Sequence, residues 1–303
     1  MKPTTICFDI NNLAMRNLFG PDVLKFSSSD KKKVVSMDTE LFKFRVFDAI
    51  YKSLYKVQGV NEVVLAMDDR RSWRKLYWTK YKSHRKDARD KLNFESIGGW
   101  EGYYDMYEGF LSEIRDHFPF KMIQCKDTEA DDVIGVLCLD KPQDFYIISN
   151  DKDFLQLSRK NVKIYNPLKK THVDHPNPEL FLVEECMKGQ AKDNIFNVKT
   201  PLDWPDGKRK PGFGEKAFEK VLAHSGGWEQ WLTDNDLRER YEFNRNLMDF
   251  ARVPPEIKRR IIRDYDEYQK PDLTEILPFF QKYKWPDYME NFTNVENKIM
   301  SVY

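Results

Sequence analysis

Short, β-rich apolar segments alternate along this chain with segments of helical periodicity, and this alternation constrains the fold more than any other feature. Such an order is typical of an α/β domain built on a central, mostly parallel sheet flanked by helices. We predict helices near residues 39–57, near 103–117 and from 128 onward, and strands at residues 4–9, 62–68, 121–125, 144–149 and 162–166. Beyond about residue 178 the pattern becomes helical, with turn-rich breaks at 200–214 and 253–256.

Carboxylates follow four of the predicted strands. They are Asp9, Asp68, the pair Asp151 and Asp153, and the trio Glu129, Asp131 and Asp132 in TEADDVIGVL (128–137). One acid at a strand end or helix start is usually a cap, but three within four residues repel one another. Because the C-terminal ends of parallel strands meet at one edge of a sheet, we expect these acids to share one cleft. Such a cluster needs cations, and its hard oxygen ligands favour Mg²⁺ or Mn²⁺.

Other metal and phosphoryl sites fit this sequence less well. A calcium loop beginning at Asn150 would need glycine at its sixth position, where Leu155 stands. An aspartyl-phosphate phosphatase would need a second acid close to Asp9, and the five histidines form no H-x-x-x-H pair for zinc. The four cysteines are scattered, which favours free thiols in a reducing cytoplasm over disulfides.

Residues 69–91 form a strongly basic segment. It contains ten Lys and Arg against three Asp, interleaved with Trp73, Tyr77, Trp78 and Tyr81. Cations bind phosphates and flat aromatic rings stack on bases, so the composition favours nucleic-acid binding over a merely solvated basic helix. The sequence has no signal peptide and no apolar run of membrane-spanning length, so we expect a cytoplasmic protein without a membrane partner.

Seven motifs resemble those of the flap endonuclease and 5′→3′ exonuclease family and occur in the same order. They are FDINNLAMR (8–16), LAMDD (65–69), YKSHR (81–85), EADDVIGVL (129–137), SNDKDFLQL (149–157), KGQAKDNI (188–195) and PGFGEKAF (211–218). The resemblance covers about residues 4–225, and in length and layout the chain is most similar to the stand-alone bacteriophage ribonuclease H members. The E-A-D-D and D-x-D blocks are specific when they occur together and in this order.

The resemblance implies a PIN-like 5′-nuclease fold. It divides the chain into an α/β nuclease domain at residues 1–180, with a basic arch at about 69–101, and a helical C-terminal domain at 181–303. A helix-hairpin-helix element is expected at about 195–225, where PGFGEKAF could bring backbone amides close to a duplex phosphate. A single G-x-G is also an ordinary turn, so its position in the chain carries this assignment.

The resemblance also implies two divalent ions, Mg²⁺ or Mn²⁺, in the acid cluster. The acids that match the first ion are Asp9, Asp68, Glu129 and Asp131, with Asp132 beside them; those that match the second are Asp151, Asp153 and Asp193. Two such ions could hold an attacking water and the leaving oxygen of a phosphodiester. Gln190 stands where the family normally has an acid, so we expect weaker occupancy of the second ion.

Two basic residues match arch residues that reach the scissile phosphate. They are Lys82 and Arg85 of YKSHR, which we expect to be catalytic together with Asp131. Tyr81 matches an aromatic residue that stacks on the nucleic-acid strand. The remaining expected nucleic-acid contacts are Arg16, Arg70, Arg71, Arg74, Lys80, Gly212, Gly214 and Lys216.

The expected function is that of a monomeric, metal-dependent 5′ nuclease. Its substrates would be DNA with 5′ flaps or forks and RNA–DNA or DNA duplexes, and it would remove RNA primers during lagging-strand DNA replication. A single-stranded-DNA-binding protein could be a partner. One alternative is a DNA-junction binding protein with weakened or lost nuclease activity, motivated by Gln190. Another is a single-strand ribonuclease of the PIN-like class, which the long arch and the helix-hairpin-helix disfavour.

Overall fold

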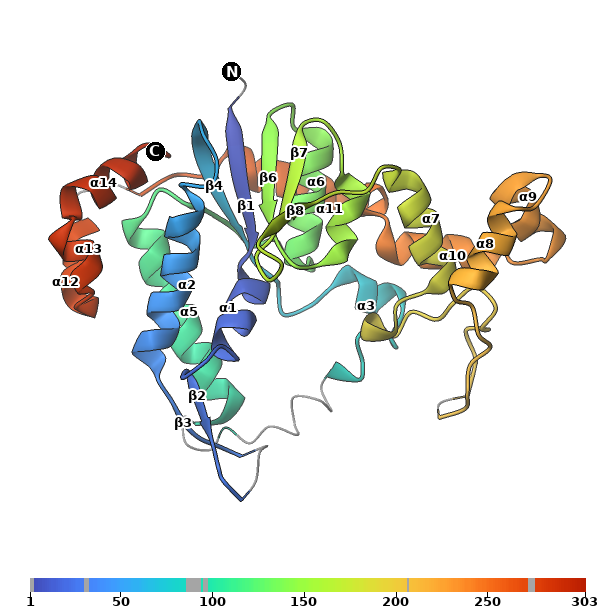
Figure 1. Ribbon diagram of the computed structural model, residues 1–303, viewed down its shortest axis with the longest axis horizontal. Coiled ribbons are helices and arrows are strands. Elements are labelled where there is room, and N and C mark those ends of the chain that lie inside the picture. Colours follow the sequence, from blue (N-terminus) through green and yellow to red (C-terminus); the bar gives the residue numbers. More distant parts are fainter. Residues whose placement is uncertain (1–2, 30–32, 86–93, 95–97, 206, 272–275) are drawn as a thin grey trace.

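A six-stranded sheet forms the centre of the molecule (Figure 1). The computed structural model describes residues 3–29, 33–85, 94, 98–205, 207–271 and 276–303. The strands lie in the order β5-β4-β1-β6-β7-β8 and are β1 (Thr4–Asp9), β4 (Val60–Ala66), β5 (Lys121–Ile123), β6 (Asp144–Ile148), β7 (Val162–Asn166) and β8 (Thr171–Val173). Every neighbouring pair is parallel except β7 and β8. The predicted α/β fold with a mostly parallel sheet is confirmed.

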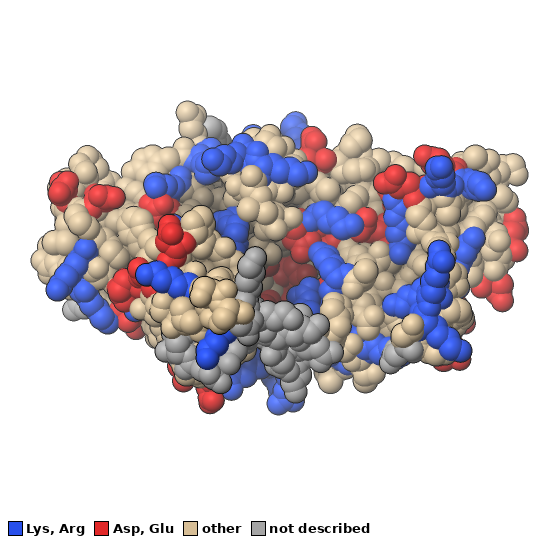
Figure 2. All heavy atoms as spheres, turned by 60° about the horizontal axis from the view of Figure 1, so that its bottom comes forward, with Lys and Arg blue, Asp and Glu red and all other residues tan. Residues whose placement is uncertain are grey.

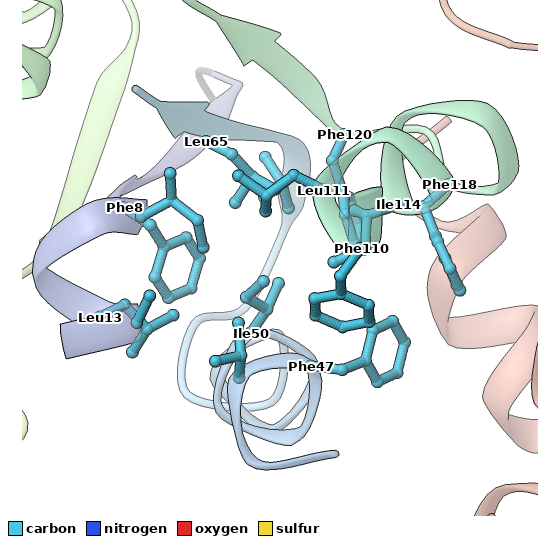
Figure 3. Packing of buried hydrophobic residues seen from close by; sticks show 14 of the residues in the cluster. Phe8, Leu13, Phe47, Ile50, Leu65, Phe110, Leu111, Ile114, Phe118 and Phe120 are labelled. Atoms are coloured by element: carbon cyan, nitrogen blue, oxygen red, sulfur yellow. The ribbon is translucent and has the colours of Figure 1, made fainter. Parts of the chain in front are cut away.

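Helices cover both faces of this sheet, as a parallel sheet requires. Along β1 the side chains alternate, so that Ile6 and Phe8 enter one core and Cys7 enters the other. The first core is closed by α1 (Ile10–Leu18), α2 (Thr39–Ser53) and α5 (Gly99–His117). Figure 3 shows Phe8 and Leu65 of the strands facing the apolar side chains of these helices. The second core is closed by α6 (Ala130–Asp140) and α11 (Pro255–Asp266).

The segment between β1 and α2 differs from the prediction. No helix or strand was predicted between residues 9 and 39, whereas the structure has α1 and a hairpin of β2 (Leu24–Phe26) and β3 (Val34–Met37). Helix α1 starts directly at the end of β1 because the Asp9 carboxylate accepts a hydrogen bond from the Asn12 amide at 2.8 Å. These elements are too short to give a clear periodic pattern.

A third cluster of buried residues lies beside the sheet and is helical. It is built by α7 (Pro178–Lys188), α8 (Glu215–Leu222), α9 (Gly227–Asp234) and α10 (Arg238–Met248), and it includes Trp78 and Tyr81, which follow the short helix α3 (Trp73–Tyr77). Three 3₁₀ helices lie between these elements: η2 (Lys152–Leu157), η3 (Ala191–Asp193) and η4 (Phe250–Arg252). Of the predicted helix-hairpin-helix at 195–225, the described part contains one helix, α8, at the end of a long connection from α7.

After α10 the chain returns to the two cores of the sheet. Helix α11 packs on α6, and α12 (Ile276–Tyr283), α13 (Pro286–Glu290) and α14 (Phe292–Met300) form an outer layer against α2 and α5 (Figure 1). The Phe47 ring of α2 lies 5.8 Å from Phe279 and 5.4 Å from Trp285, between ring centroids.

The division into two domains at residue 180 stays a prediction. Among the helices that the structure describes, none combines the length and apolarity needed to cross a bilayer.

Contact between α6 and η4 depends on a glycine, and this can be tested. A Cβ atom added at Gly135 of α6 would lie 2.5 Å from Cγ and 2.8 Å from Cβ of Phe250. We expect Gly135→Ala to lower the free energy of unfolding by about 1–3 kcal/mol through overpacking. The control is Gly109→Ala on the exposed side of α5, where nothing lies within 4 Å of the new Cβ. It should raise stability by about 0.5–1 kcal/mol because alanine favours the helix. Urea unfolding measures both; equal effects would contradict the packing described.

Candidate active site

The predicted acids lie along the edge formed by the C-terminal ends of the strands, which is the lower edge of the sheet in Figure 1. Asp9 is the last residue of β1, and Asp68 follows β4 by two residues. The Asp68 carboxylate accepts a hydrogen bond from the Ala130 amide at 2.8 Å, which joins the end of β4 to the start of α6. Figure 2 shows acidic side chains in a hollow near the middle of this face, with Lys and Arg side chains around it.

The acids of the E-A-D-D motif, at the start of α6, make different contacts and have different roles. Glu129 is the N-cap residue, and its amide donates to the Asp132 carboxylate at 3.0 Å. Asp132 is fully buried, accepts a further hydrogen bond from the Trp73 indole at 3.0 Å and forms an ion pair with Arg74 at 2.7 Å. Asp132 therefore caps the helix and holds α3; its expected place beside the ions stays a prediction.

Arg74 is a buried connector between three elements. Its side chain is 2% exposed, and besides Asp132 it contacts Glu129 at 3.1 Å and Asp131 at 3.7 Å. Its Nε atom donates to the Leu247 carbonyl of α10 at 2.7 Å. The expected role of Arg74 as a nucleic-acid contact is thus corrected, because its guanidinium faces the interior and joins α3, α6 and α10.

Two residues of the YKSHR motif contact Glu129. The Tyr81 hydroxyl donates to one Glu129 oxygen at 2.8 Å, and the Lys82 ammonium donates to the other at 2.6 Å. Burial by itself would raise the pKa of Glu129, but Lys82 and Arg74 outweigh it and lower this pKa to about 2. Tyr81 is 3% exposed, so its ring packs inside the protein and does not present the stacking face that was expected.

Asp9, Asp68, Glu129 and Asp131 form what we call the first acid group. Burial raises the pKa of Asp9 to about 7, and repulsion from Asp68 acts in the same direction. Burial also raises the pKa of Asp131, although Arg74 opposes it, and Asp131 Oδ1 is a buried atom with no hydrogen-bond partner. Within the described part of the chain, neither Asp9 nor Asp68 has an ion-pair partner.

Asp151, Asp153 and Asp193 form the second acid group, which lies on η2 and η3. Asp151 caps η2 by accepting from the Asp153 amide at 3.0 Å, and the Lys192 ammonium pairs with both aspartates. Lys192 lowers the pKa of Asp151 against the opposing effect of burial. Asp193 is buried and forms an ion pair with Arg85.

The base of the predicted arch is fixed to this second group. The Lys82 amide donates to the Asp193 carbonyl at 2.9 Å, and the Asn194 side chain donates to the Lys80 carbonyl at 3.0 Å. Lys82 and Asn194 adopt positive φ angles of 53° and 59°, which turn both segments sharply at this junction. Residues 86–93 and 95–97 of the arch lie outside the described residues.

The other predicted nucleic-acid contacts lie at the surface. Arg70, Arg71 and Arg85 are exposed, and Arg16 and Lys80 are partly exposed. Gly212, Gly214 and Lys216 are exposed at the N-terminal end of α8, away from the acid groups. A Cβ atom at either glycine would meet open space, so a partner could approach the backbone there.

The donor chemistry of the first acid group fits a divalent ion. Among the described residues Asp9 and Asp68 have no ion-pair cation. Asp131 Oδ1, which has no hydrogen bond and lies 3.7 Å from Arg74, is a hard donor of the kind that Mg²⁺ and Mn²⁺ take. As the side chains lie, no three Asp, Glu, His or Cys residues in the described part of the chain are arranged to hold a metal ion. Lys and Arg side chains lie among the acids instead, and the second group in particular is already paired.

Two residues of the site received no role from the sequence. They are Glu185, which contacts Gln190, and Lys192. Trp73, which was grouped with the aromatics of a nucleic-acid-binding segment, instead donates a hydrogen bond to Asp132. A signal for Lys192 was present, because it lies two residues after the position where the family's acid is replaced by Gln190. Nothing in the sequence pattern distinguished Glu185 from the other acids of α7.

Two family models match this chain. Residues 4–185 match the 5′-3′ exonuclease, N-terminal resolvase-like domain, and residues 176–295 match the T4 RNase H C-terminal domain. The chain is 30% identical over 239 residues to ribonuclease H of Enterobacteria phage T4. This match covers 75% of this chain and 77% of that protein.

More distant relatives share the nuclease part or the fold. DNA polymerase I of Caldicellulosiruptor bescii is 27% identical over 305 residues, but the match spans only 32% of the polymerase. The structure resembles the phage T5 D15 protein co-crystallized with metal ions, with a TM-score of 0.64, 16% identity and coverage of 87% of this chain and 98% of that one. The predicted PIN-like fold is thereby confirmed.

The buried position of Arg74 leads to a prediction about stability. Arg74→Met should lower the free energy of unfolding by about 3–5 kcal/mol, because it leaves Asp132 buried without its cation. Arg70→Ala in the same segment is the control, since its side chain is 88% exposed and should change stability by less than about 0.5 kcal/mol. Thermal and urea unfolding measure both variants. A small effect of Arg74→Met would show that this residue is not the connector described here.

The raised pKa of Asp9 predicts a pH-dependent stability of the metal-free protein. In the unfolded chain Asp9 titrates near its ordinary value of 3.8, and in the folded protein near 7, so the folded state becomes less stable as pH rises between these values. Asp9→Asn should therefore melt at a higher temperature than the wild type at pH 8 in EDTA, and at a similar temperature at pH 4. The asparagine can still cap α1. An equal difference at both pH values would exclude this titration as the cause.

Proposed function

Because the chain belongs to the 5′-3′ exonuclease family, we propose that it is a divalent-metal-dependent 5′ nuclease acting on 5′-flap DNA and on RNA–DNA or DNA duplexes. In this role it would remove RNA primers during lagging-strand DNA replication. The observation that carries the proposal is the set of acids at the sheet edge, where Lys82 pairs with Glu129 of the first acid group and Arg85 with Asp193 of the second. An acid cluster binds the cations that a phosphodiester substrate needs, and the basic residues bind its phosphate.

The residues that would hold a divalent ion are Asp9, Asp68 and Asp131. When bound, such an ion would supply a more acidic water and stabilise negative charge on the leaving oxygen. Arg74 fixes the positions of Glu129 and Asp131, because its guanidinium contacts both carboxylates and donates a hydrogen bond to the Leu247 carbonyl of α10. This support keeps mutually repelling carboxylates close together before any ligand arrives.

Lys82 and Arg85 would hold the scissile phosphate. Their side chains reach Glu129 and Asp193, so both cations already point from the base of the arch toward the acid groups. A phosphate arriving between them would exchange these carboxylate contacts for charge-assisted bonds to its own oxygens. The exposed end of α8, with Gly212, Gly214 and Lys216, would contact the duplex part of the substrate at a second place.

A direct assay tests this function against its alternatives. The substrates are a 5′-labelled flap DNA, an RNA–DNA hybrid and single-stranded RNA, each with Mg²⁺, with Mn²⁺ or with EDTA. We expect cleavage of the flap and the hybrid with either metal and none in EDTA. Binding of the flap without cleavage in any metal would favour a junction-binding protein. Cleavage confined to single-stranded RNA would favour a PIN-like ribonuclease.

Asp131→Asn should abolish cleavage while DNA binding persists. The asparagine keeps the size of the side chain on the first turn of α6 but removes a hard anionic donor from the first acid group. Asp140→Asn at the exposed end of the same helix is the control and should cleave like the wild type. Single-turnover cleavage and a gel-shift assay on the flap DNA measure the two properties. Full activity of Asp131→Asn would remove this residue from the proposed site.

A further inference from the structure

The Lys192 ammonium lies between two aspartates of the second acid group. Its Nζ atom is 2.8 and 3.0 Å from the two Asp151 oxygens and 3.0 Å from Asp153 Oδ2. A lysine ammonium has three hydrogen-bond donors, and each of these distances is that of a hydrogen bond. Lys192 therefore lies in the place that an ion bridging Asp151 and Asp153 would need.

Gln190 completes the pairing of these aspartates. Its side-chain amide donates to Asp153 Oδ1 and also contacts Glu185 Oε2 at 3.3 Å, and the side chain is only 5% exposed. All four carboxylate oxygens of Asp151 and Asp153 thus accept hydrogen bonds from Lys192 or Gln190. An acid at position 190 would instead place a third carboxylate against Asp153 and Glu185, where like charges repel.

The first acid group is different in this respect. Asp9 and Asp68 accept hydrogen bonds from the amides of Asn12 and Ala130, both at 2.8 Å, and neither forms an ion pair with any described residue. Backbone amides leave the charge of two neighbouring carboxylates largely uncompensated. Asp9 and Asp68 therefore have no paired cation in the described part of the chain, whereas Asp151 and Asp153 share Lys192. The other two acids of the first group, Glu129 and Asp131, contact Lys82 and Arg74.

We propose that Lys192 is a built-in cation of the second acid group, so that the protein binds one divalent ion, in the first group, where two were expected. The inference rests on the proposed function and specifies how many ions that function uses. It also gives a reason for the departure from the family pattern at position 190. Gln190 fits this arrangement, because a carboxylate at position 190 would face Asp153, whose ion pair with Lys192 is already shared with Asp151.

Counting bound Mn²⁺ tests this proposal without reference to activity. Isothermal titration, combined with electron paramagnetic resonance of the free ion, gives the number of Mn²⁺ per chain. We expect one for the wild type and two for the double variant Gln190→Asp/Lys192→Ala. The second ion of the double variant should bind at least about tenfold more tightly than any second ion of the wild type, a typical size for a change close to a metal. Lys188→Ala is the matched control, because its ion pair with Glu184 lies on α7 outside the site, and it should still bind one ion.

Each other outcome has a distinct meaning. Two ions of similar affinity in the wild type would overturn the inference, because Lys192 would then move aside for the second ion. A double variant that still binds one ion would also overturn it. No bound ion in the wild type would instead overturn the proposed metal-dependent function. Circular dichroism checks that each variant is folded, and Lys192→Gln replaces the double variant if that one does not fold; it should gain a weaker second ion.

Discussion

Repulsion between clustered carboxylates is the constraint on which the rest of this structure depends. A parallel sheet brings its C-terminal strand ends to one edge, and this chain places acids at several of them. The protein stabilises them with its own cations, most of all with Arg74, which contacts three acids of α6 while anchored to the Leu247 carbonyl. The helices of the third cluster therefore do more than cover the sheet. They hold the arginine that allows the acids to stay close together.

The two acid groups differ in the contacts that stabilise their negative charges. Asp151 and Asp153 receive their positive charge from Lys192 on a neighbouring 3₁₀ helix. Asp9 accepts a hydrogen bond from a backbone amide and has no ion pair with a described residue, and burial raises its pKa, which is the property of a site that gains from binding a cation. The asymmetry follows from two positions in a short turn, Gln190 and Lys192, and not from any difference in the sheet that supports the two groups.

Much of this architecture could be predicted from the sequence, because it depends on periodicity and on position relative to strand ends. The parallel sheet and the gathering of Asp9, Asp68 and Asp131 at one edge follow from those two rules. The direction of individual side chains does not. Arg74 and Tyr81 lie in a basic, aromatic segment and were expected to face nucleic acid, yet both are buried against Glu129. Composition reports which groups a segment carries, but only packing decides which of them face the solvent.

The return of the C-terminal helices to the first core has a consequence for synthesis of the protein. Ile299 and Val302 are fully buried in the first core, which also contains residues of the much earlier elements β1, α1 and α2. We expect the first core to remain incomplete, and the helices beneath it loosely packed, until these residues have left the ribosome. The edge of the sheet that carries the acids would therefore become rigid only after these C-terminal helices have been made and packed.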